Sequence, residues 1–62
     1  MQRYKQLSLA DYLACRVESY TGGATWLWDA AQQVFYVIPG APVQIRQELE
    51  AGREVEAEES EE

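Results

Sequence analysis

Ala24-Thr-Trp-Leu-Trp-Asp-Ala-Ala-Gln-Gln-Val-Phe-Tyr-Val-Ile38 is the stretch that decides the fold. Its two ends are rich in aromatic and β-branched residues and its centre is small or polar, which is typical of two strands and a turn. Asp29 suits the first position of that turn. A loop with an even number of residues, centred between Ala31 and Gln32, pairs Asp29 with Val34. A helix through residues 24–38 is the alternative, because the centre carries no Gly or Asn.

The even register divides the hairpin into two faces. One face is wholly apolar, and we expect it to form the core against the helices: Trp26, Trp28, Phe35 and Val37. The other face would stay exposed on a two-stranded sheet with only two helices to cover it, which favours contact with another chain. The predicted partner-binding residues on that second face are Leu27, Val34, Tyr36 and Ile38. A private second layer of core is the alternative use of these four side chains.

A first helix is expected over residues 9–20. Ser8 is a good N-cap, and Asp11 stands at the position of the capping-box acid. Apolar residues then recur at spacings of four, four and three, as one helix face requires. Gly22-Gly23 fits a helix C-terminus, since Gly adopts the left-handed conformation without penalty. The apolar stripe consists of Leu9, Leu13, Val17 and Tyr20.

A second helix is expected over residues 42–51. Pro42 fits its first turn, and Gly52 supplies a C-cap. Ile45 and Leu49 are four residues apart and face one way. A short strand over residues 43–46 is the alternative. The sequence therefore predicts a small single α+β domain, a helix–β-hairpin–helix unit over residues 1–52.

The net charge of −6 is concentrated at the C-terminus. Residues 1–47 hold four basic and three acidic side chains, whereas residues 48–62 hold Arg53 and eight glutamates. A segment with so many charges and so few apolar residues buries too little surface to repay its ordering entropy. Residues 53–62 are therefore predicted to be a disordered, flexible acidic tail. Four of its residues are candidates for a further contribution to partner binding: Glu54, Glu56, Glu58 and Glu59.

Composition excludes several classes of function. The chain has no His and a single cysteine, Cys15, which excludes a zinc finger, a disulfide scaffold and His-dependent catalysis. Acidic neighbours should raise the pKa of the Cys15 thiol and disfavour a nucleophile. We expect no enzyme activity, no cofactor and no metal. No basic stripe or apolar span is present, so direct binding to nucleic acid or membrane is not favoured. An unpaired cysteine without a signal segment indicates the cytoplasm.

The remaining class is a small, non-enzymatic protein-binding module. We expect an accessory inhibitor or adaptor of the size encoded by phages and mobile elements. Such a protein could block a host nucleic-acid-handling or defence complex by placing its acidic tail in a basic groove. The alternative is a structural or assembly subunit, such as a homodimer or larger homo-oligomer, and a nucleic-acid-binding regulator is less favoured. Stacking of Trp26 and Trp28 on a sugar or base is a further alternative to their role in the core.

Overall fold

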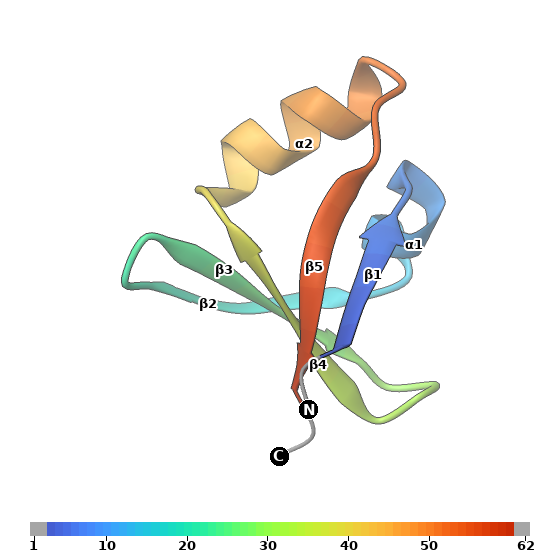
Figure 1. Ribbon diagram of the computed structural model, residues 1–62, viewed down its shortest axis with the longest axis vertical. Helices are drawn as coiled ribbons and strands as arrows, with labels where there is room; N and C mark the ends of the chain where they lie inside the picture. The colour runs from blue at the N-terminus through green and yellow to red at the C-terminus, as the bar shows by residue number, and fades with distance from the viewer. Residues whose placement is uncertain (1–2, 61–62) are drawn as a thin grey trace.

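A five-stranded antiparallel sheet with two short helices on one face makes up the structure (Figure 1). The computed structural model describes residues 3–60. The strand order in the sheet is β1-β5-β4-β3-β2. The expected helix–hairpin–helix fold is therefore wrong, because three of the five strands lie outside the predicted hairpin. The elements in chain order are β1 (Arg3–Leu7), α1 (Leu9–Leu13), β2 (Arg16–Thr21), β3 (Ala24–Asp29), β4 (Val34–Pro39), α2 (Pro42–Glu50) and β5 (Val55–Ser60).

The hairpin of β3 and β4 forms in the predicted register. Asp29 pairs with Val34, and every pair from there to Thr25 with Ile38 is the expected one. The Asp29 carboxylate accepts hydrogen bonds from the backbone amides of Ala31 and Gln32, at 3.1 and 3.2 Å. These hydrogen bonds stabilise the turn, and Gln33 adopts the left-handed conformation, with φ of 57°, that a Gly or Asn would favour. The alternative of a helix through residues 24–38 is wrong.

The helix expected over residues 9–20 is only partly present. The predicted cap exists: Ser8 and Asp11 exchange hydrogen bonds in a capping box at the start of α1. The helix ends at Leu13, however, and residues 16–21 form strand β2. Gly22-Gly23 is the turn between β2 and β3, with φ of 62° and 78°. A two-residue hairpin turn of type I′ needs positive φ at both positions, and paired glycines supply it as readily as they end a helix.

The second helix is confirmed. It runs from Pro42 to Glu50, with Ile45 and Leu49 buried on one side. Gly52 adopts φ of 89° beyond its end. The Gly52 amide donates to Leu49 O at 3.0 Å and the Arg53 amide to Glu48 O at 3.1 Å. These two bonds satisfy carbonyls that the helix end would otherwise leave unpaired.

The predicted disordered tail is wrong over residues 55–60, which form a central strand. β5 pairs with β1 on one side and β4 on the other. Val55 and Ala57 face the core, and Ala57 is 0% exposed. Glu56 and Glu58 point to the opposite face, so the strand needs only two small apolar side chains inside. Glu61 and Glu62 lie outside the described residues.

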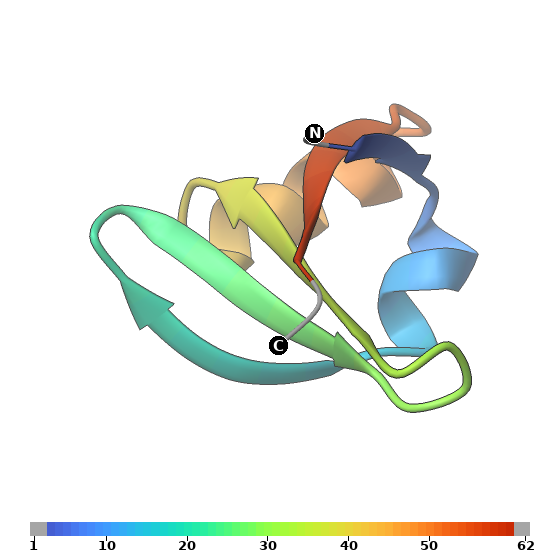
Figure 2. The same cartoon turned by 60° about the horizontal axis from the view of Figure 1, so that its bottom comes forward.

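The two helices lie on one face of the sheet, here called the inner face, and no helix among residues 3–60 lies on the other, the outer face (Figure 2). The expected orientation of the hairpin is therefore reversed. Leu27, Val34, Tyr36 and Ile38, predicted to be exposed, lie in the core, and Leu27 and Tyr36 are 0% and 2% exposed. Because both faces of the hairpin are apolar, alternation alone could not predict which face is buried. The position of the helices and of the three other strands determines that. The core consists of Leu7, Tyr12, Leu27, Val34, Tyr36, Ile38, Ile45, Leu49 and Ala57.

A chain ending at Arg53 should show no cooperative thermal unfolding by circular dichroism. Its loss of β5 removes the partner strand of both β1 and β4 and opens the core at Ala57. A chain ending at Ser60 is the control, because it loses two glutamates but keeps all of β5. Its melting temperature should stay close to that of the full chain. A cooperative transition near the original temperature in the shorter chain would contradict the central position of β5.

Candidate functional site

The outer face of the sheet carries the aromatic residues that were expected in the core. Trp26 and Trp28 on β3 lie beside Phe35 on β4, and all three are half-buried. The Phe35 ring centroid is 5.8 Å from that of Trp26 and 4.8 Å from that of Trp28, in edge and tilted arrangements. Such ring pairs are favourable beyond the area they bury. The cluster thus shields itself in part while its remaining surface faces solvent.

Beside this cluster the sheet opens into a cleft between β4 and β5. Within residues 3–60, the β4–β5 ladder comprises three residue pairs, from Phe35 with Ser60 to Val37 with Glu58. Beyond Val37 the two strands diverge toward α2, as Figure 1 shows. Pro39 cannot donate a backbone hydrogen bond there and so does not extend the ladder.

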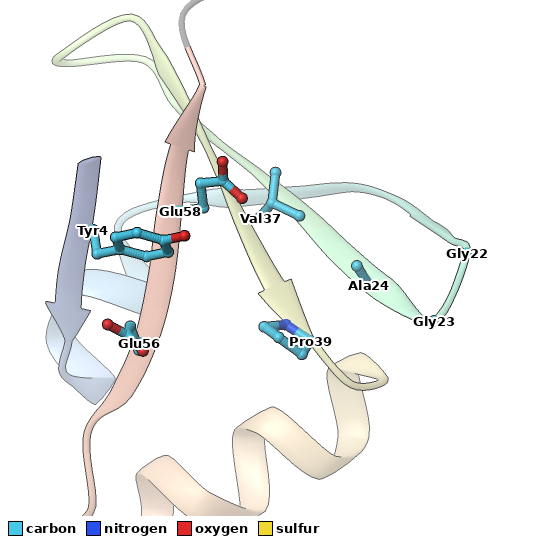
Figure 3. Close-up of a pocket in the computed structure, with 8 residues that line it drawn as sticks. All are labelled: Tyr4, Gly22, Gly23, Ala24, Val37, Pro39, Glu56 and Glu58. Atoms are coloured by element: carbon cyan, nitrogen blue, oxygen red, sulfur yellow. The ribbon is translucent and has the colours of Figure 1, made fainter. Parts of the chain in front are cut away.

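An open pocket of about 410 Å³ lies over this divergence. Val37, Pro39 and Ala24 contribute apolar surface to it. In Figure 3 the Tyr4 ring extends from β1 across β5, with Glu58 and Glu56 on either side of it. The Gly22-Gly23 turn completes the lining. We call this pocket, defined by Tyr4, Ala24, Val37, Pro39, Glu56 and Glu58, the β4–β5 cleft.

The β4–β5 cleft is acidic. Glu56 is exposed and Glu58 half-buried, and no basic residue within 3–60 lines the cleft or forms an ion pair with either carboxylate. The basic residues that do form ion pairs in this part of the chain are bound to other glutamates: Arg16 to Glu18, Arg46 to Glu50 and Arg53 to Glu48. The outer face thus combines aromatic rings with two uncompensated negative charges.

The predicted site residues do not form one site. The four apolar ones are buried in the core on the inner face, where they can contact no partner without unfolding. Glu59 lies on that same face, paired with Tyr36 in the β4–β5 ladder, and Glu54 is exposed between α2 and β5. Glu56 and Glu58 alone come together, in the β4–β5 cleft. Sequence reasoning missed Tyr4. Val55 and Ala57 alternate with glutamates, which could have indicated a strand, but Arg3–Leu7 shows no apolar alternation that would have paired it with β5.

A second group of polar side chains lies at one end of the inner face. The Lys5 ammonium is 5.7 Å from the centroid of the Tyr36 ring. Its pKa is raised, mainly by the charge interaction with Tyr36 and also by those with Asp11 and Asp29. Burial raises the pKa of the Tyr36 phenol and of the Cys15 thiol, and Asp29 raises both further. The predicted direction for Cys15 is confirmed.

These shifts hold each group in its ordinary protonation state at neutral pH. Lys5 stays charged, while Tyr36 and Cys15 stay neutral. Asp11 and Asp29 are used structurally, as the cap of α1 and the anchor of the β3–β4 turn. The group therefore supports the fold, and the pKa values of Lys5, Tyr36, Cys15 and Asp11 are shifted away from the neutral range in which a general acid or base works best.

Comparison with protein-family models, curated proteins and solved structures gave no match. Within residues 3–60, no helix is both long and apolar enough to cross a membrane. In the same range, no group of three or more His, Cys, Asp and Glu side chains could hold a metal ion.

The Asp11 carboxylate should make the stability of the fold depend on pH. Hydrogen bonds from Ser8, first from its backbone amide, lower the pKa of the Asp11 carboxyl below 3.8. Its stabilising contribution is therefore present above that value and is lost as pH falls through the lowered pKa. Asp11→Asn should lower the free energy of unfolding at about pH 7 and change it much less at about pH 2. Urea unfolding of both proteins measures this; an equal difference at the two pH values would contradict the role of the charge.

Proposed function

We propose that the chain is a non-enzymatic protein-binding module that contacts its partner through the outer face of the sheet. The observation that carries this proposal is the aromatic cluster of Trp26, Trp28 and Phe35 on a face that neither α1 nor α2 covers. Aromatic residues concentrate binding energy at protein interfaces, and a half-buried cluster is already ordered before binding. The proposed interface extends from this cluster to the β4–β5 cleft.

Within this class we favour an inhibitor or adaptor over an assembly subunit that completes a sheet. The exposed edge strand β2 has a register irregularity between Val17 and Ser19 and carries the Arg16–Glu18 ion pair. Bulges and charges on an edge strand oppose pairing with another chain. A partner is thus better placed on the outer face than along this edge. The inhibitor or adaptor acts, in this proposal, by covering a functional surface of its target.

A protein partner fits the surface better than a nucleic acid. Glu56 and Glu58 lie beside the aromatic cluster and would repel phosphates, whereas stacking on single-stranded bases normally accompanies a positive groove. We propose the cytoplasm as the compartment, since a free thiol such as Cys15 stays reduced there.

The proposal is tested by affinity capture from a lysate of the source cells, with mass spectrometry. The full chain is immobilised as wild type, as Trp28→Thr and as Tyr20→Thr. Tyr20 is the matched control because it is an aromatic strand residue, 52% exposed, that pairs with buried Thr25 and so belongs to the opposite face. A specific partner should be retained by wild type and by Tyr20→Thr, and reduced about tenfold or more by Trp28→Thr.

Each variant is first checked for cooperative thermal unfolding. If Trp28→Thr does not fold, Tyr4→Thr replaces it, since Tyr4 is 56% exposed on edge strand β1 and matches Tyr20 closely. Equal retention of the partner by all variants, or loss through Tyr20→Thr alone, would overturn the outer face as the interface. Retention of nucleic acid in place of protein would overturn the partner class.

A further inference from the structure

We propose that the β4–β5 cleft binds an arginine or lysine side chain from a basic segment of the partner protein. This inference rests on the proposed function and names the chemistry that the outer face recognises. The occupant's aliphatic stem lies over the apolar surface of Val37 and Pro39. Its cationic head lies among Glu56, Glu58 and the ring of Tyr4.

The shape of the cleft supports a long side chain. Because β4 and β5 diverge beyond Val37 and Glu58, the opening runs from the outer face toward α2. Pro39 and Glu56 line both this opening and a neighbouring pocket of about 350 Å³ under α2, so the two hollows adjoin. Long basic side chains place their methylene groups on apolar surface while keeping the charge at a polar rim. The apolar floor and acidic rim of the cleft match that division.

The three polar or aromatic groups of the rim favour a cation. Glu58 is paired directly with Tyr4 in the β1–β5 ladder. Glu56 precedes Glu58 by two residues and lies on the same side of β5. Carboxylates hydrogen-bond to guanidinium or ammonium groups, and an aromatic face attracts the same charge. Arginine satisfies both kinds of contact, because its planar head can stack on a ring and bond to a carboxylate at once. The absence of a basic lining residue within 3–60 leaves this charge to be supplied from outside.

Two other occupants fit less well. A second copy of the chain docked face to face would bring Glu56 and Glu58 against their own equivalents, and each chain carries a net charge of −6. A calcium ion needs about six or more oxygen ligands. The cleft offers two carboxylates over an apolar floor, so a divalent metal ion of this kind fits less well. A cationic side chain on an otherwise apolar segment complements both the cleft and the neighbouring aromatic cluster.

The test uses a fluorescein-labelled decapeptide of alternating arginine and valine, with fluorescence anisotropy as the measurement. In a second peptide citrulline replaces arginine, which keeps the shape and removes the charge. The full chain is compared with Glu56→Gln/Glu58→Gln. The matched control is Glu18→Gln/Glu50→Gln, which changes the net charge equally at glutamates that are already paired with Arg16 and Arg46.

We expect the arginine peptide to bind the full chain, and both the citrulline peptide and the Glu56→Gln/Glu58→Gln variant to weaken binding about tenfold. The control variant should bind within about twofold of the full chain, because screening limits the influence of distant charges. In amide NMR spectra of the labelled protein, the peptide should shift Tyr4, Val37, Glu56 and Glu58 and leave the far side of α2 unchanged.

No binding of the arginine peptide, equal binding of the citrulline peptide, or equal weakening by both double variants would overturn the inference. These outcomes are separable from failure of the proposed function. If the cell partner is still lost through Trp28→Thr while Glu56→Gln/Glu58→Gln retains it, the outer face is the interface and the cationic occupant is wrong. If the partner is retained by every outer-face variant, the proposed function itself fails.

Discussion

The backbone ladder between β1 and β5 joins the two ends of the chain, and the rest of the structure depends on it. It pairs Arg3 with Glu59 and continues to Leu7 with Val55, so it closes the sheet through contacts between residues far apart in sequence. β5 also pairs with β4, which makes the C-terminal strand the link between β1 and the β2–β3–β4 meander. The inner face then brings Leu7 and Ala57, both 0% exposed, against the side chains that the helices supply.

The placement of β5 also determines which face of the sheet is left open. Alternation sends Val55 and Ala57 to one face and Glu56 and Glu58 to the other. A helix over the glutamates would have to bury two carboxylates without partners, at a cost of several kcal/mol for each charge. The helices therefore cover the face with the smaller apolar residues, and the aromatic rings of β3 and β4 stay beside the glutamates. An acidic, aromatic outer surface thus follows from the packing of the core.

Local signals were sufficient for part of this architecture. The polar centre of residues 24–38 correctly predicted the β3–β4 hairpin and its register. Pro42, together with the spacing of Ile45 and Leu49, correctly predicted α2. Gly22-Gly23 was ambiguous, because a helix end and a primed hairpin turn both need positive φ.

The role of β5 was hidden for a different reason. Its glutamates oppose strand formation locally, and its partner β1 lies at the other end of the chain. Of the residues that line the β4–β5 cleft, only Glu56 and Glu58 were predicted to bind a partner. The position of Tyr4 and the divergence of β4 from β5 depend on tertiary structure. The most direct test of the exposed aromatic face is acrylamide quenching of tryptophan fluorescence, since both tryptophans lie on it. The free chain should be quenched readily, and the arginine–valine peptide should reduce that quenching. Tryptophans already shielded in the free chain, or quenching unchanged by the peptide, would contradict this account.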